Sequence, residues 1–204
     1  MLFRRHLLQT AALAPLLGAA RGWALSPRVL QFPRDHGAHP ELRTEWWYLT
    51  GQAQTSVGRE FGFQVTFFRS RVDGTQAMTS RLAARQLLFA HAAITDVQAG
   101  KLWHDERIAR WNGAPGGAAD ASLQDTDVRL SGWSFQRQAE GYTTHITGDD
   151  LRLDLRAETT QPLLLQGHQG LSRKGPDAAQ ASHYYSQPQL VVSGYLRLQG
   201  QRFE

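Results

Sequence analysis

The 204-residue chain contains no cysteine. Disulfide bonds, thiol catalysis and cysteine-based zinc sites are therefore excluded, and the hydrophobic core alone must hold the fold together. The chain also lacks a phosphate-binding loop, a dinucleotide-binding fingerprint and a nucleophile elbow. From these absences we expect no cofactor, and we expect no bound metal.

A dense basic patch is lacking too, although the net charge is +4 and the pI is about 9.8. Three of the 22 basic residues (Arg4, Arg5 and Arg21) fall within residues 1–24, which contain no acid. The remaining 19 basic and 18 acidic residues are interleaved, so no cluster of Lys and Arg is available to neutralise phosphates. Nucleic acid is therefore not an expected partner.

No hydrophobic run is long enough to span a membrane, since the longest, near the N-terminus, has roughly a dozen apolar residues. Residues 1–24 instead have the order of a signal peptide: a charged start, a short apolar centre and small residues near the exit. The pair Arg4-Arg5 before the apolar centre is typical of a twin-arginine signal. We expect cleavage after Ala20 or Ala24, and a periplasmic or secreted protein without a membrane span.

After an extended, proline-containing lead-in at 25–43, the chain predicts one β domain over 44–204. The clearest strand is 60–69, where Phe61, Phe63 and Val65 alternate with residues of the opposite face. Further strands are expected at 45–52, 86–97, 101–109, 128–136, 142–147, 151–156 and 190–198, a loop at 112–121, and a weak helical alternative at 79–88. Strands at this spacing are typical of a sandwich or a barrel, and composition does not choose between them.

Two histidines, His36 and His39, precede Glu45, so a metal site is one interpretation. The spacing is more typical of loop histidines that cap a turn. Glu45 stands immediately before Trp46, Trp47 and Tyr48, and partial desolvation there would raise its pKa and suit it to proton transfer. The alternative role is a bond to the backbone or to Arg43.

Two further motifs contain candidate ligand contacts. His91 lies in the apolar run 87–94, where a lone histidine is more often a satisfied core residue than a catalyst. Tyr184 and Tyr185 follow the loop 170–175, and a tyrosine offers a ligand both a flat apolar face and a hydroxyl. Both tyrosines could equally be core aromatics.

The segments 32–40 (FPRDHGAHP) and 44–51 (TEWWYLTG) resemble the opening signature of the carotenoid 1,2-hydratase and AttH-like secreted hydrolase family. The similarity continues through 63–69 (FQVTFFR), 90–96 (AHAAITD), 170–175 (GLSRKG) and 182–186 (SHYYS).

The resemblance implies a lipocalin-like antiparallel β-barrel, the first of two, with a site near their junction. It also implies addition of water to an isoprenoid-like substrate without a cofactor, by a neutral carboxylic acid in an aromatic tunnel. Glu45 is then the catalytic candidate, and the expected ligand contacts are Trp46, Trp47, Tyr48, Gln64, His91, Tyr184 and Tyr185.

The family pattern continues into an acid- and tryptophan-rich segment and a second barrel, and this chain stops at Glu204, where that segment would begin. We therefore expect the second barrel, and the acid that matters most for hydration, to be missing. Three functional hypotheses follow: a hydratase or hydrolase acting on an apolar lipid-like molecule, a non-catalytic lipocalin-like carrier or sensor of such a molecule, and an inactive fragment. The oligomeric state stays open.

Overall fold

The computed structural model describes residues 25–139 and 141–204; the predicted leader lies outside them. The described residues form antiparallel β-sheets with two single-turn 3-10 helices, η1 (Arg34–His36) and η2 (Asp73–Thr75). The all-β, lipocalin-like fold expected from the sequence is confirmed.

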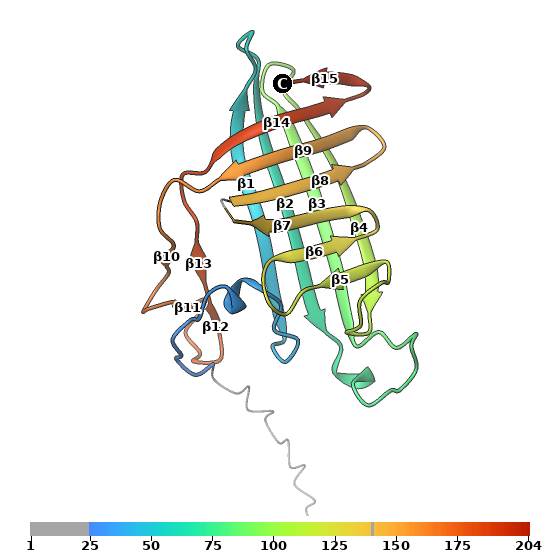
Figure 1. Ribbon diagram of the computed structural model, residues 1–204, viewed down its shortest axis with the longest axis vertical. Coiled ribbons are helices and arrows are strands. Elements are labelled where there is room, and N and C mark those ends of the chain that lie inside the picture. Colours follow the sequence, from blue (N-terminus) through green and yellow to red (C-terminus); the bar gives the residue numbers. More distant parts are fainter. Residues whose placement is uncertain (1–24, 140) are drawn as a thin grey trace, which may run out of the picture.

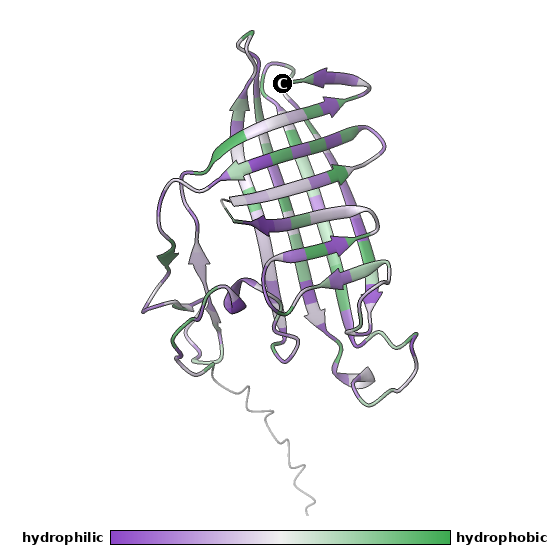
Figure 2. Ribbon diagram, in the orientation of Figure 1, coloured by the Kyte–Doolittle hydropathy of each residue, from purple (hydrophilic) through white to green (hydrophobic). Residues whose placement is uncertain are grey.

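The first sheet has four long strands in chain order, each antiparallel to the next. They are β1 (Thr44–Gln54), β2 (Glu60–Arg71), β3 (Gln86–Asp96) and β4 (Lys101–Trp111). Along β2 the predicted alternation holds, because Phe61, Phe63 and Val65 are buried while Gln64 is exposed. Figure 2 shows the same alternation of hydrophobic and hydrophilic residues on neighbouring strands.

The second sheet has seven strands and lies across the first, as Figure 1 shows. In spatial order they are β15 (Gln201–Phe203), β14 (Val191–Leu198), β9 (Leu151–Glu158), β8 (Gly141–Thr147), β7 (Trp133–Gln138), β6 (Asp127–Leu130) and β5 (Ala119–Ala121). The core fills the space between the sheets with side chains such as Phe67, Ile94, Leu130, Trp133 and Leu153, all almost fully buried. Burial of these apolar surfaces is the main stabilising contribution to such a fold.

Among the described residues the hydrogen-bonded ladders of the two sheets do not join, so the sheets are not closed into a barrel. The excursion between β9 and β14 forms two small hairpins beside β1, visible in Figure 1. In one, β10 (Leu164–Leu165) pairs with β13 (Tyr185–Ser186); in the other, β11 (Leu171–Arg173) pairs with β12 (Ala181–His183). These hairpins and the lead-in 25–43 surround the free edge of β1.

Several local predictions were wrong. Residues 128–136 are not one strand but a hairpin, because Ser131 and Gly132 adopt positive φ angles of 49° and 85° and reverse the chain. The weak helical alternative at 79–88 does not form, and the last of these residues begin β3, as the strand prediction at 86–97 required. The end of the expected loop at 112–121 forms β5, which covers the edge of β6. The long apolar run at 86–97 is typical of a strand buried on both faces, but β3 is buried on one face only, since Leu88 is fully buried while its neighbours in sequence are partly exposed.

Candidate functional site

A cleft of about 1330 Å³ lies beside β1, the edge strand of the four-stranded sheet. Because no described strand pairs with the free edge of β1, side chains from both of its faces line the cleft. The other walls come from the lead-in, from residues 179–192 and from Phe135 and Tyr142 of the seven-stranded sheet. The cleft is therefore assembled from segments that are distant in sequence.

Aromatic side chains form the apolar part of this cleft. Trp46 and Tyr48 project from one face of β1, and Trp47 projects from the other. The rings of Trp46 and Tyr184 have centroids 6.1 Å apart, and the hydroxyls of Tyr48 and Tyr184 are 2.6 Å apart. Tyr185 completes the set. Six of the eight predicted site residues thus line one cleft, namely Glu45, Trp46, Trp47, Tyr48, Tyr184 and Tyr185.

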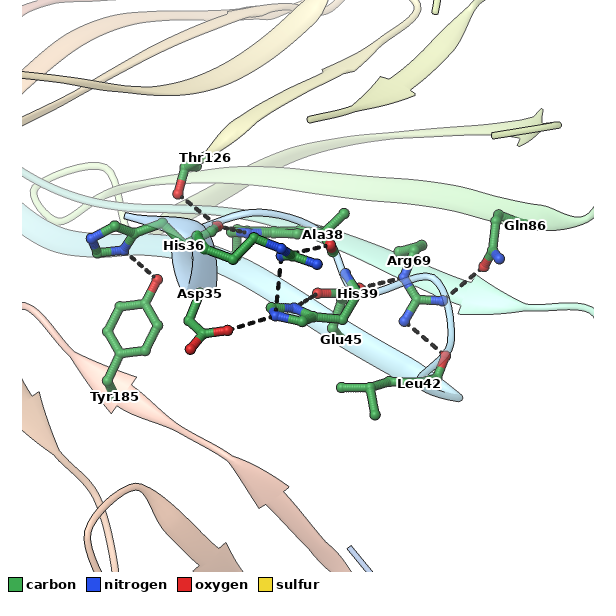
Figure 3. Close-up of polar contacts among 12 residues, drawn as sticks. Asp35, His36, Ala38, His39, Leu42, Glu45, Arg69, Gln86, Thr126 and Tyr185 are labelled. Atoms are coloured by element: carbon green, nitrogen blue, oxygen red, sulfur yellow. Dashed lines mark hydrogen bonds and ion pairs between the residues drawn. The ribbon is translucent and has the colours of Figure 1, made fainter. Parts of the chain in front are cut away.

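At the polar end of the cleft, charged side chains form a chain of hydrogen bonds (Figure 3). The buried carboxylate of Asp35 accepts two bonds from Arg28, both 2.8 Å, and its Oδ1 lies 2.9 Å from His39 Nε2. His39 Nδ1 is 3.2 Å from Glu45 Oε1, and Arg69 Nε donates to Glu45 Oε2 at 2.5 Å. One imidazole therefore bridges two carboxylates, each of which is also paired with an arginine.

This arrangement shifts two pKa values in opposite directions. The hydrogen bond to Glu45 raises the pKa of His39, against the opposing effect of burial, and the bond to Asp35 raises it further. Burial alone would raise the pKa of Asp35, but hydrogen bonds from Arg28, the Gln31 N–H and His39 hold it well below its usual value. The hydrogen bonds therefore favour the protonated form of His39 and the ionised form of Asp35.

A second polar pair joins the lead-in to β13. Figure 3 shows the contact between His36 and the hydroxyl of Tyr185. His36 Nδ1 lies 2.8 Å from this hydroxyl, and the two rings meet edge to face. Burial lowers the pKa of His36 to about 4, assisted by the charge of Arg137, and burial raises the pKa of Tyr185. Both groups are therefore neutral near pH 7. The backbone oxygen of His36 also accepts bonds from Trp47 Nε1 and Thr126 Oγ1.

Glu45 binds the backbone and an arginine, as the alternative, non-catalytic prediction for this residue described. Its Oε2 accepts a 2.7 Å bond from the His39 N–H as well as the bond from Arg69. The expected arginine partner was Arg43, and the structure shows Arg69 instead. Arg69 is fully buried and also donates to Gln86 Oε1 and to the Leu42 oxygen. With both carboxylate oxygens engaged, Glu45 is well placed to orient the lead-in against β1.

Gln64 and His91 do not line the cleft. They lie on the face of the four-stranded sheet that is turned away from the core, with their side-chain nitrogens 3.4 Å apart. His91 is only partly buried, so the expectation of a core histidine was wrong. His91 pairs in register with Thr66 of β2, and Thr66 pairs with Tyr48 of β1. His91 and Gln64 therefore lie on the same face of the sheet as Tyr48.

Three charged residues of the site, Arg28, Arg69 and Lys174, were not predicted from the sequence. Arg69 had a signal, because it follows Phe67 at a spacing of two on the inward face of β2, where a charge requires a partner. Lys174 lines the cleft from the end of β11. Nothing in the local sequence pairs Arg28 with Asp35.

Two other features that the sequence raised are a metal site at the histidines and a membrane-spanning segment. Among residues 25–139 and 141–204, no group of three or more His, Asp or Glu side chains is placed to hold a metal ion. His36 and His39 instead bond to different partners. In the same residues no helix is both long and apolar enough to cross a membrane.

Comparison with known proteins gives two positive results. The family model described as AttH-like matches residues 24–204. The crystal structure of a candidate AttH from Nitrosomonas europaea is 44% identical, with a TM-score of 0.76, over 88% of this chain and 53% of that one. This chain therefore spans about half the length of that relative. The search of curated proteins found no match to the present chain.

Proposed function

The chain belongs to the AttH-like family, and from that premise we propose that it is an exported protein that binds an apolar, lipid- or isoprenoid-like small molecule in the cleft beside β1. The observation that carries the proposal is the lining of this cleft. Five aromatic side chains from two segments that are distant in sequence, 46–48 and 184–185, line a space large enough for a long hydrocarbon chain.

The paired charges favour binding over turnover. Acid-catalysed hydration requires a carboxylic acid that holds a proton near an apolar substrate. Asp35 is held ionised by Arg28 and His39, and both oxygens of Glu45 accept hydrogen bonds. Neither carboxyl group therefore resembles a proton donor poised over the aromatic wall.

A second candidate function is hydration or hydrolysis of the same kind of molecule. It is favoured by the position of Glu45, which lines the cleft directly beside Trp46 and Trp47. Glu45→Gln separates the two functions, because an enzyme that uses this acid loses turnover whereas a carrier keeps its affinity. Turnover that survives Glu45→Gln would remove Glu45 from the catalytic role.

The binding proposal is tested with hexadecanol and geranylgeraniol, by titration calorimetry on the purified chain. Replacing Trp46 and Tyr184 together by alanine is expected to weaken binding at least tenfold, since each aromatic ring that a ligand covers contributes on the order of 1 kcal/mol or more. The control is Leu102→Ala, which truncates an exposed apolar side chain on β4 outside the cleft. Equal affinities in all three proteins, or no binding to the unsubstituted chain, would contradict the proposal.

A further inference from the structure

Lys174 brings a positive charge to the aromatic corner of the cleft. It follows β11, and its backbone N–H donates to the Gln180 oxygen at 2.6 Å, so the β11–β12 hairpin fixes its position. Its Nζ lies 4.4 Å from the centre of the Tyr184 ring and 5.9 Å from that of Trp46. It also donates to Ser172 Oγ at 3.1 Å. The ammonium group is thus held against the aromatic wall.

The pairing of Lys174 differs from that of the charges at the other end of the cleft. Arg28, Asp35, His39 and Glu45 neutralise one another or pair with Arg69. Within the part of the chain that the structure describes, no carboxylate lies within ion-pair distance of Lys174. Its positive charge is balanced only by the faces of two rings and one hydroxyl, which leaves ammonium hydrogens available to an anion.

Two phenols beside Lys174 supply a further donor. Only one hydrogen can lie between the hydroxyl oxygens of Tyr48 and Tyr184, which are 2.6 Å apart. The other O–H can be donated to a third acceptor, either the neighbouring hydroxyl of Ser186, which also bonds with Tyr48, or a ligand. Burial and the bond to Tyr184 raise the pKa of Tyr48 to about 12, so this phenol keeps its proton near pH 7.

Resting on the proposed function, we propose that the ligand is an anionic amphiphile whose acidic head binds Lys174 and the Tyr48–Tyr184 phenol pair. The hydrocarbon tail then lies along Trp46 and other apolar side chains that line the cleft, such as Leu190 and Val192. A carboxylate or phosphate head offers the oxygen acceptors that an ammonium and a phenol require. A neutral alcohol of the same length fills the apolar cleft but gains no charge-assisted bond.

The test compares hexadecanoate, hexadecyl phosphate and hexadecanol as ligands of the purified chain, below their micellar concentrations, by titration calorimetry. The unsubstituted chain should bind at least one of the anions about tenfold more tightly than hexadecanol, which is the increment typical of a charge-assisted hydrogen bond. The two anions together show which head group the corner accepts. Lys174→Gln should abolish the preference and leave hexadecanol binding unchanged.

Arg43→Gln is the matched control, because Arg43 also lines the cleft but contacts none of these rings, and it should keep the preference. An anion preference that survives Lys174→Gln, or a wild-type chain that binds hexadecanol as well as both anions, would overturn the head-group inference and leave the proposed function standing. Failure of all three ligands to bind would overturn both.

Discussion

At position 69 a guanidinium replaces the hydrophobic side chain that the inward face of β2 otherwise carries. Burying a charge is unfavourable unless it is paired, and here the partners are Glu45, Gln86 and the Leu42 oxygen. Arg69 thus ties the lead-in, β1 and β3 together at the polar end of the cleft. Because Arg69 is fully buried, loss of its contacts should lower the free energy of unfolding more than loss of a surface ion pair would.

Arg69→Met is expected to lower the free energy of unfolding by about 3 kcal/mol, because it removes the arginine partner of Glu45 in a partly buried place and leaves only His39 beside this carboxylate. Urea denaturation followed by circular dichroism measures the loss. Arg129→Met is the control, since Arg129 pairs with Asp127 on the solvent-exposed surface and its removal should leave the free energy of unfolding almost unchanged. Equal losses in the two variants would show that Arg69 is not a structural centre.

His36 makes stability depend on pH. Its pKa falls from 6.5 in the unfolded chain to about 4 in the folded one, so below pH 6.5 the unfolded state binds a proton that the folded state does not. Stability therefore decreases as pH falls from 6.5 towards 4, by up to about 1.4 kcal/mol per pH unit. His39 has a raised pKa, so its contribution is already complete below pH 6.5 and is lost only at higher pH.

Urea denaturation at several pH values between 4.5 and 6.5 measures this slope. His36→Gln removes the titrating group and keeps a hydrogen-bonding side chain towards Tyr185, so its slope should be shallower by about one proton. A slope that is unchanged in His36→Gln would assign the pH dependence to other groups.

At the scale of elements, the hairpin β6–β7 shows how a two-residue turn decides register. Ser131 and Gly132 both have positive φ, as a type I′ turn requires, and Leu130 pairs directly with Trp133. A one-residue shift would carry Leu130 and Trp133, both buried, to the solvent face. The Ser-Gly pair is a recognised turn signal, and the sequence prediction missed it because apolar residues continue on both sides.

Ser131→Asn is expected to raise the free energy of unfolding by about 0.5 kcal/mol, because asparagine tolerates the left-handed region better than serine does. Ser131→Val should lower it by 1 kcal/mol or more, since a β-branched side chain is strained at positive φ. Thermal denaturation ranks the three proteins. Equal stability of the valine and asparagine variants would contradict the assignment of a type I′ turn at Ser131 and Gly132.

At the scale of the whole molecule, the two sheets enclose the core, and the cleft lies beside the unpaired edge strand β1. The lead-in and the hairpins between β9 and β14 are far apart in sequence, yet they meet across the edge of β1 through contacts such as His36 with Tyr185 and Tyr48 with Tyr184. An unpaired edge strand exposes backbone groups, and these segments cover it. The same cover forms the cleft.

The export proposal also concerns the whole chain. Expressed with its first 24 residues in a bacterium that has the twin-arginine pathway, the protein should appear outside the cytoplasm and begin at Arg21 or Leu25. Replacing both Arg4 and Arg5 by lysine should retain the uncleaved chain inside the cell. Cell fractionation with N-terminal sequencing distinguishes these outcomes, and normal export of the lysine variant would reject a twin-arginine signal.

The sequence by itself determined the all-β class and most strands, because alternation with a period of two is a local property that one buried face imposes. It also indicated six residues of the cleft, since the acid and aromatic residues at 45–48 and the tyrosines at 184 and 185 stand together in the chain.

Only the tertiary structure decided which of these residues meet and in what state. The bonds of Arg69 to Glu45, of Arg28 to Asp35 and of Lys174 to the Tyr184 ring depend on how distant segments pack. Likewise, strand register places His91 on the face of the sheet that is turned away from the core, and its position on β3, two strands in from the edge strand β1, keeps it out of the cleft. Charge pairing and desolvation act through space, and local sequence does not specify them.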